Sequence, residues 1–192
     1  MTMPDYNDDI KNAVETLRRG GVILYPTDTV WGIGCDASDS KAVKRVFEIK
    51  RRADSKALIA LVGSMAQLER TVESVPDVAA QLIEVSDRPV TVVYDHGRGV
   101  AREMLSSDGS LAVRVTSEAF SRALCLAFGR AIVSTSANIS GLPAPRFYNE
   151  ISPEIISAAD YVCLSRRNDT KPSKPSMVIK ISEGGLFKIL RD

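Results

Sequence analysis

Two polar clusters stand where short apolar runs of the sequence end. The run Val22–Tyr25 is followed by Pro26 and then by Thr27, Asp28 and Thr29. The run 131–134 opens into a second cluster, with the sequence Ser134-Thr135-Ser136-Ala137-Asn138. Hydroxyl and amide groups at a strand end can hold phosphate or ribose oxygens, although the same groups also cap turns. Both clusters are therefore candidates for contacts with a small polar ligand.

Basic side chains supply the other half of the candidate chemistry. Lys50, Arg51 and Arg52 directly follow a helical pattern, where cations ordinarily complement the helix dipole and lie in solvent. Alternatively, Lys50 and Arg52 converge on a polyphosphate, because a guanidinium binds phosphate through two parallel hydrogen bonds. Arg114 lies inside the apolar run Leu111–Val115, and a buried arginine needs an anionic partner from the protein or from a ligand. These residues indicate an anionic substrate.

Other catalytic motifs are absent or weak. No Walker A sequence occurs, and residues 32–37 match only the loose G-x-G-x-x-[GA] pattern. That pattern starts six residues after the strand, and Lys50 and Arg52 stand where a dinucleotide fold needs a ribose-binding acid. His96 is the only histidine and lies in a glycine-rich stretch, so neither a histidine metal site nor a hydrolytic triad is expected. The three cysteines are far apart, and we expect them to be reduced and buried.

The composition fits one globular domain. The chain has 192 residues, 44% of them hydrophobic, and a net charge of +1 from 25 basic and 24 acidic residues. This balance does not favour a nucleic-acid binder, although basic residues cluster at 41–56 and 166–174. No apolar run approaches the ~20 residues of a membrane span, and the start of the chain lacks the apolar segment of a signal peptide. We expect a single domain over 1–192 and a cytoplasmic protein.

Alternating helices and strands must position these side chains. Hydrophobic periodicity predicts helices over 10–19, 39–49, 64–73, 77–85, 117–127 and from Ser152 onward, with caps at Asp39 or Ser40, Ser117 and Ser152. Short apolar runs predict strands over 22–25, 58–62, 90–94, 111–115, 131–134, 161–164, 177–181 and 186–190. The polar, basic stretch 165–176 predicts a mobile loop. Because the last two strands form a hairpin, the expected fold is α/β with a mixed sheet.

Four motifs, in order along the chain, resemble the YrdC/TsaC family of threonylcarbamoyl-AMP synthases. Residues 25–34 match the family pattern Y-P-T-[ED]-T-x-[YFW]-G-[LIV]-G, and Lys50 with Arg52 matches K-x-R. Ala112–Arg114 matches the A-V-R strand, and Ser134–Gly141 matches S-x-S-A-N-x-S-G. The resemblance runs from about 13 to 191, which is nearly the whole chain.

The resemblance implies a YrdC/RibB-like fold, with a twisted mixed sheet and flanking helices around a concave basic cleft. It implies a nucleotidyltransferase that joins L-threonine, bicarbonate and ATP, with Mg²⁺, into threonylcarbamoyl-adenylate and pyrophosphate. A transferase complex resembling TsaB/TsaD/TsaE would then modify tRNA. The implied threonine contacts are Thr29, Arg114 and Ser176. The implied ATP contacts are Lys50, Arg52, Lys56, Ser110, Ser134, Ser136, Asn138 and Arg191.

Under this resemblance no protein side chain is a metal ligand, and catalysis is chiefly positioning and electrostatic stabilisation by Lys50 and Arg52.

Departures from the pattern indicate the short, single-domain branch. Leu61 replaces a histidine, Met177 replaces a threonine, and Ala53 replaces a proline, so two threonine contacts of longer members are lost. A sister branch resembling YciO lacks K-x-R and S-A-N, which this chain keeps. A non-catalytic RNA-binding module of the same fold, acting for instance in rRNA maturation, stays open as the alternative.

Overall fold

A computed structural model describes residues 6–52, 58–171 and 175–192. The elements up to residue 94 are α1 (Asn7–Arg18), β1 (Ile23–Tyr25), β2 (Gly32–Gly34), α2 (Ser40–Ile49), β3 (Ile59–Val62), α3 (Met65–Thr71), α4 (Asp77–Val85) and β4 (Val90–Tyr94). The remaining elements are η1 (Arg102–Met104), β5 (Leu111–Val115), α5 (Ala119–Phe128), β6 (Ile132–Ser136), η2 (Tyr148–Glu150), α6 (Pro153–Ala158), β7 (Tyr161–Val162), β8 (Met177–Ile181) and β9 (Phe187–Arg191).

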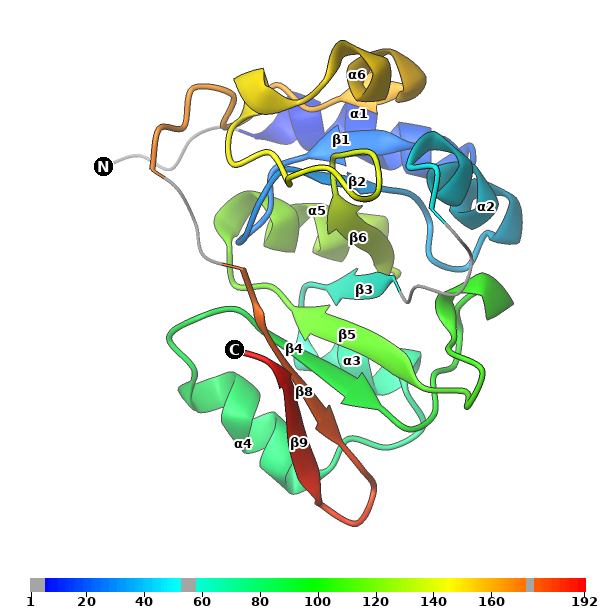
Figure 1. The fold of residues 1–192 in the computed structure, drawn as a ribbon, viewed down its shortest axis with the longest axis vertical. Helices are drawn as coiled ribbons and strands as arrows, with labels where there is room; N and C mark the ends of the chain where they lie inside the picture. The colour runs from blue at the N-terminus through cyan, green and yellow to red at the C-terminus, as the bar shows by residue number, and fades with distance from the viewer. Residues whose placement is uncertain (1–5, 53–57, 172–174) are drawn as a thin grey trace.

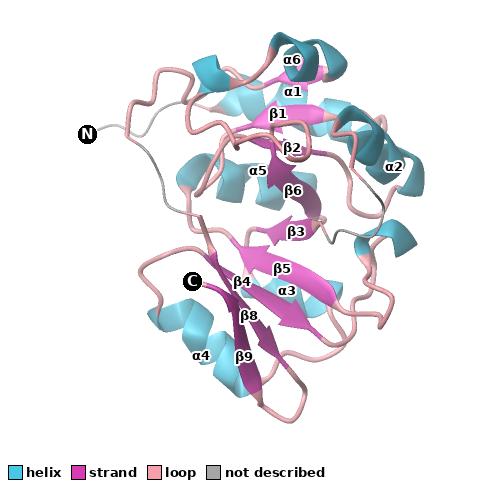
Figure 2. Cartoon of the chain, in the orientation of Figure 1, coloured by secondary structure: helices cyan, strands magenta, loops and turns pink. Residues whose placement is uncertain are grey.

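The strands of the described residues form one nine-stranded sheet in the order β7-β1-β2-β6-β3-β5-β4-β8-β9 (Figures 1 and 2). The pairs β1–β7, β3–β5 and β4–β8 are parallel, whereas the other neighbouring pairs are antiparallel. The mixed α/β sheet predicted from the sequence is therefore confirmed. The chain crosses the sheet repeatedly, which brings segments distant in sequence to the same surface.

Helix caps explain most of the helix boundaries. The Asp39 carboxylate accepts hydrogen bonds from the backbone N–H groups of Lys41 and Ala42, at 2.9 and 3.2 Å, and so starts α2 as predicted. Ser152 likewise caps α6, which has a proline in its first turn. The prediction of Ser117 as the cap of α5 is wrong. Glu118 caps that helix instead, because its longer carboxylate reaches the backbone N–H groups of both Phe120 and Ser121.

Strand β2 was not predicted, because three residues with two glycines give no strand pattern. It nevertheless pairs with β1 on one side and β6 on the other. A Cβ atom on Gly34 would lie 2.0 Å from the Val133 carbonyl oxygen, so only glycine allows this approach. The G-x-G pattern thus serves strand packing at Gly34. The strand expected over 161–164 ends at Val162, and the last strand runs to Arg191 rather than residue 190.

Gly34→Ala should lower the free energy of unfolding by roughly 1–3 kcal/mol or more, because the added methyl group forces β2 away from β6. Gly184→Ala is the matched control, since a Cβ atom there meets nothing within 4 Å. Urea unfolding of both variants measures the effect. Equal stability of the two variants would contradict the packing role of Gly34.

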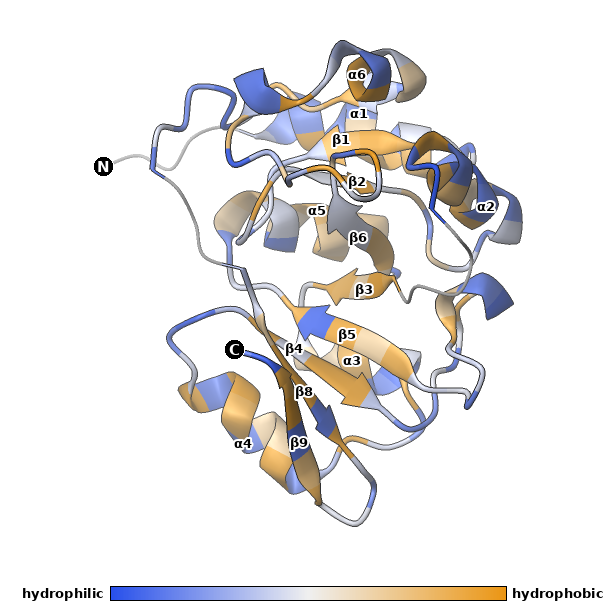
Figure 3. Cartoon of the chain, in the orientation of Figure 1, coloured by the Kyte–Doolittle hydropathy of each residue, from blue (hydrophilic) through white to orange (hydrophobic). Residues whose placement is uncertain are grey.

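The two faces of the sheet are covered differently. One face carries a large apolar cluster that includes Val92, Val113 and Val133 and packs against residues of α2, α3, α4 and α6. The opposite face carries a smaller cluster, with Leu61 and Ile132 beneath α1 and α5. Figure 3 shows the strands as mostly hydrophobic and the outer turns of α1 and α2 as hydrophilic. The second face is covered over only part of its length, and a cavity lies over the rest.

Candidate functional site

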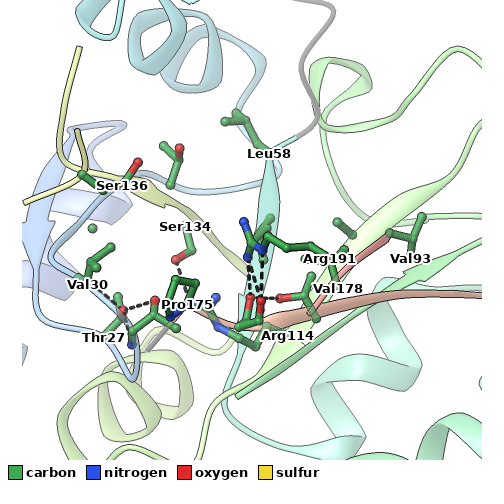
Figure 4. Close-up of a pocket in the computed structure, with 18 of the residues that line it drawn as sticks. Thr27, Val30, Leu58, Val93, Arg114, Ser134, Ser136, Pro175, Val178 and Arg191 are labelled. Atoms are coloured by element: carbon green, nitrogen blue, oxygen red, sulfur yellow. Dashed lines mark hydrogen bonds between the residues drawn. The ribbon is translucent and has the colours of Figure 1, made fainter. Parts of the chain in front are cut away.

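The candidate site is a cavity of about 470 Å³, within the size range of small-molecule pockets. Strands β3, β4, β5, β6 and β8 form its floor, and residues before β2, after α2 and at the end of β9 form its walls. Figure 4 shows side chains of these distant segments pointing into one space. Its polar lining consists of Thr27, Thr29, Arg52, Thr91, Arg114, Ser134, Thr135, Ser136, Ser176 and Arg191.

Strand register explains why polar side chains meet on this floor. Thr91 pairs with Arg114 across β4 and β5, and Ile59 pairs with both Ala112 and Ser134. Since alternate residues share a face, Arg114 and Ser134 point to the same side as Thr91. Arg114 Nη2 donates to Ser134 Oγ at 3.4 Å. The antiparallel and parallel pairings together therefore place an arginine among hydroxyl groups.

Arg114 has an anionic partner within the protein, which is one of the two kinds of partner, protein or ligand, that the sequence left open. Its Nε lies 3.2 Å from Asp28 Oδ1, and both side chains are at least nine-tenths buried. Among the described residues, neither of these two atoms makes an aligned hydrogen bond. Burial raises the pKa of Asp28, and the Arg114 guanidinium opposes that rise. The pair is thus held by charge, and an entering carboxylate could give Arg114 an aligned second partner.

The two threonines of the 26–31 loop are ordered by their hydroxyl groups. Thr27 Oγ1 donates to the Val30 carbonyl at 2.7 Å and accepts from the Thr29 backbone N–H at 3.1 Å. The two hydroxyl oxygens lie 3.1 Å apart. Because a hydroxyl has one proton and that of Thr27 is used, Thr29 must donate to Thr27. Thr29 consequently presents an acceptor to the cavity, suited to a hydroxyl or N–H group of a ligand.

The turn after α2 sends Lys50 and Arg52 inward and Arg51 outward. The backbone N–H of Arg52 bonds to Phe47 O and that of Arg51 to Glu48 O, which is the Schellman arrangement. Arg51 occupies the left-handed region at φ 49° and pairs with Glu154 at the surface. Arg52 lines the cavity, and its burial lowers its pKa. The K-x-R spacing follows from this turn.

Lys50 differs from the sequence-based expectation that it contacts phosphate. It is fully buried, does not line the cavity, and donates to the carbonyls of Ser136 and Asn138. Its own carbonyl accepts from the Ser140 N–H at 2.8 Å. Burial, with Arg52 nearby, lowers the pKa of Lys50 to about 7. In this structure Lys50 therefore ties the end of α2 to the S-A-N segment, which supports Ser136 in the cavity wall.

The difference in stability between wild type and Lys50→Met should depend on pH, which tests the lowered pKa of the buried Lys50 amine. The folded-state pKa lies below the unfolded value, so the unfolded chain binds more protons between about pH 7 and 10.5. The penalty for burying the charged amine is complete below pH 7 and is relieved as pH rises. Urea unfolding should therefore show wild type gaining stability relative to Lys50→Met from pH 7 to 10. A constant difference across that range would contradict the lowered pKa.

Arg191 reaches the cavity through an irregularity of the last hairpin. The register between β8 and β9 shifts so that Ile179 faces Ile189 while Val178 faces Arg191. Leu190 is the extra residue, and such a bulge re-aims the side chains beside it. Arg191 Nε and Nη2 donate to the Ser176 carbonyl at 3.1 and 2.8 Å. Ser176 Oγ lies 2.9 Å from Thr91 Oγ1, so these three side chains form one end of the site.

Two predicted contacts lie outside the cavity, and a third falls on residues that the structure does not describe. Asn138 stabilises its own loop, since its Nδ2 donates to the carbonyls of Ile139 and Leu142, and it lines a neighbouring hollow. Ser110 is buried beside Asp108, to which its N–H and hydroxyl both donate. Lys56 and Ala53 lie outside the described residues. Leu61 and Met177 are buried in the apolar clusters and do not line the cavity.

Some residues of the site were not singled out from the sequence. Thr91 is a polar residue inside the apolar run of β4, and it lines the cavity. A polar residue within an apolar strand was the same signal that singled out Arg114. Asp28 was quoted in the loop motif, but its pairing with Arg114 over 86 residues of sequence had no signal. Within the described lining, three arginines face the cavity and no carboxylate does. The cavity is therefore suited to an anionic ligand.

Other potential sites have no matching geometry. His96 is exposed, and the three cysteines are free and buried as expected. Among the described residues, no group of three histidine, cysteine, aspartate or glutamate side chains could hold a metal ion. Within the same residues, every helix is too short or too polar to cross a membrane.

Comparisons with known proteins match nearly the whole chain to one family. Residues 15–192 match the Sua5/YciO/YrdC family, whose description is "Telomere recombination". The threonylcarbamoyl-AMP synthase of Chromohalobacter salexigens is 43% identical over 144 residues, which cover 73% of this chain and 77% of that protein.

Two solved structures extend the comparison. Sua5 of P. abyssi in complex with L-threonine has a TM-score of 0.79 at 29% identity, covering 89% of this chain and 50% of that one. This chain therefore spans half the length of that Sua5 chain. E. coli YciO has a TM-score of 0.80 at 26% identity, covering 95% of this chain and 88% of that one. The predicted fold and family resemblance are confirmed.

Proposed function

The chain belongs to the Sua5/YciO/YrdC family, and on that premise we propose that it is an L-threonylcarbamoyladenylate synthase. The observation that carries the proposal is the cavity itself, where Arg52, Arg114 and Arg191 face one space among hydroxyl groups and no described carboxylate. ATP, bicarbonate and the threonine carboxylate are all anionic. A lining that is basic and rich in hydroxyl groups matches these three substrates together.

The reaction is a nucleotidyl transfer in two bond-forming steps. The threonine nitrogen attacks the bicarbonate carbon, a C–N bond forms, and water leaves to give a carbamate. A carbamate oxygen then attacks the α-phosphorus of ATP, and the bond to the bridging oxygen breaks as pyrophosphate leaves. Negative charge shifts across the phosphates in this step, so fixed guanidinium groups stabilise the transition state. The proposal therefore needs no protein nucleophile.

Threonine is placed at the end of the cavity that holds the 26–31 loop. The Thr29 hydroxyl, whose proton is committed to Thr27, accepts from the hydroxyl or nitrogen of threonine. Arg114 binds the threonine carboxylate or the carbamate, for which its charge pair with Asp28 leaves an aligned position open. Ser176 lines the same cavity beside Thr91.

ATP is placed along the wall that Arg52 and β6 form. Arg52 binds the triphosphate, with Ser134, Ser136 and Arg191 around the nucleotide. Lys50 and Asn138 act by holding the Ser136 segment in place. We treat Mg²⁺ as part of the ATP substrate, held by its phosphates, which fits a described lining without carboxylates.

The product is a labile adenylate, so a second enzyme must consume it. We propose that a transferase complex of the TsaB/TsaD/TsaE type passes the threonylcarbamoyl group to tRNA, and that the protein acts in the cytoplasm. Direct RNA binding as the main function is not favoured, because the chain is 36–43% identical over most of its length to proteins named as the synthase.

Release of pyrophosphate from ATP tests the proposed function. We expect release only when L-threonine and bicarbonate are both present. Omitting either one is the control, and it should reduce the rate to background. Salt-sensitive RNA binding together with pyrophosphate release that ignores threonine would contradict the proposal.

A further inference from the structure

The basic segment Ser165–Lys171 is attached to the body of the protein next to the site. The backbone N–H groups of Leu164 and Ser165 donate to the Asp9 carboxylate of α1, at 3.0 and 2.7 Å. Arg167 donates to the carbonyls of Cys163 and Val162 and lies 4.6 Å from the ring centre of Tyr148. The sequence predicted a mobile loop here, but its described part makes directed contacts.

Arg166 is held in an unfavourable backbone conformation. Its φ is +60°, in the left-handed region, which a non-glycine residue enters at a cost. Such strain persists only where surrounding contacts fix it, and it often accompanies a functional role. The Asp9 contacts before Arg166 and the Arg167 contacts after it fix the chain on both sides. The turn thus aims the Arg166 side chain.

The Arg166 guanidinium contacts the outside of the 26–31 loop. Its Nη1 donates to the Thr27 carbonyl at 2.9 Å and lies 3.2 Å from Glu118 Oε1. Its Nε donates to Asp169 at 2.7 Å. Glu118 is also the cap of α5, so Arg166 connects the loop to the first turn of a packed helix. The side chain is about three-quarters buried and does not line the cavity.

Two arginines therefore hold this loop. Arg114 pairs with Asp28 inside the protein, and Arg166 binds the carbonyl of the residue before it. The Thr27 hydroxyl in turn accepts from both the backbone and the hydroxyl of Thr29. Displacement of the Thr27 backbone would move the Thr29 hydroxyl directly, because only this short chain of bonds separates them.

We propose that Arg166 is a positioning residue for threonine, which fixes the Thr27 carbonyl and thereby sets the place of the Thr29 hydroxyl. The inference rests on the proposed function. A guanidinium is needed because one Nη1 group serves both a carbonyl and a carboxylate while Nε holds Asp169. Arg166 acts through the loop and touches neither substrate nor reacting atoms.

Arg166→Gly is the sharpest variant, because glycine adopts φ +60° without strain and so keeps the turn while removing the guanidinium. We expect KM for threonine to rise about tenfold, while KM for ATP changes less than about twofold. Lys171→Ala is the matched control, since it removes one positive charge from the same segment without a bond to Thr27. It should leave both constants unchanged.

A double-variant cycle shows whether Arg166 acts through Thr29. Thr29→Val alone should raise KM for threonine, and adding Arg166→Gly should then raise it little further. If Arg166→Gly leaves KM for threonine unchanged while Thr29→Val raises it, the inference fails and the proposed function stands. Additive effects, or equal rises for ATP and threonine, also overturn it. If wild type makes no adenylate, the proposed function has failed instead.

Threonine binding by calorimetry separates positioning from folding. Arg166→Gly should unfold in urea at close to the wild-type midpoint, because the relieved backbone strain offsets the lost ion pairs with Glu118 and Asp169. At equal stability, its affinity for threonine should still be about tenfold lower. Should Arg166→Gly not fold, Arg166→Lys takes its place. We then expect a smaller rise in the dissociation constant for threonine, because lysine keeps the charge and loses only the forked contacts of the guanidinium. Unchanged affinity in the folded variant refutes the positioning role.

Discussion

Arg52→Ala should reduce adenylate synthesis by at least about a hundredfold while leaving the fold intact. Arg52 lines the cavity, and it is the arginine of the turn after α2 that faces inward. Removing a preorganised charge that stabilises developing negative charge costs roughly 10²–10³ in kcat. The measurement is threonine-dependent pyrophosphate release at saturating ATP, with circular dichroism to confirm folding.

The neighbouring residue provides a matched control for Arg52. Arg51→Gly also removes one arginine, but this side chain points outward, and glycine suits its φ of 49°. Activity should be close to wild type and stability equal or higher. Arg52→Lys should still lose much of the activity, because a point charge does not replace the two-pronged contact. Normal turnover by Arg52→Ala would show that Arg52 has no part in the reaction.

Valine should be a very poor substrate in place of threonine. The Thr29 hydroxyl offers an acceptor whose partner would be the threonine hydroxyl, and valine would leave it unpaired. Sites that read a hydroxyl this way reject the analogue lacking it by roughly 10⁴–10⁵. We expect kcat/KM for valine to be at least about a hundredfold lower, measured by substrate-dependent pyrophosphate release.

Serine and a site variant define the origin of this selectivity. Serine keeps the hydroxyl and lacks one methyl group, so its kcat/KM should fall less than that of valine, by about 10–200-fold relative to threonine. Thr29→Val should lower kcat/KM for threonine and thereby reduce the ratio of kcat/KM between threonine and valine. If valine and threonine were used equally by wild type, neither Thr29 nor its neighbours would read the hydroxyl.

Local patterns predicted most of the scaffold because the interactions behind them are local. Asp39 and Ser152 were recognised as caps from their position before a periodic run, and the central strands from short apolar runs. Strand β2 escaped prediction because two of its three residues are glycines, and the need for glycine at Gly34 comes from the backbone of the neighbouring strand β6. Glu118 escaped because the reach of its side chain, rather than its residue class, decides the cap of α5.

The sequence predicted which residues line the cavity better than it predicted what each residue does there. Arg52, Arg114, Ser134, Ser136, Ser176 and Thr29 were predicted and line one cavity. Lys50 carries the same charge as Arg52, yet it donates to the carbonyls of Ser136 and Asn138 and does not line the cavity. The bulge at Leu190 and the contact of Arg166 with Thr27 join residues far apart in sequence. Sequence patterns carry no record of such pairings.

Incorporation of labelled bicarbonate tests the central proposal most directly. The protein is incubated with ATP, Mg²⁺, L-threonine and carbon-13 bicarbonate, and the adenylate product is identified by mass spectrometry. We predict threonylcarbamoyl-adenylate whose mass rises by one unit relative to the product from unlabelled bicarbonate. An unlabelled threonyl-adenylate, or consumption of ATP without any adenylate that contains threonine, would contradict it.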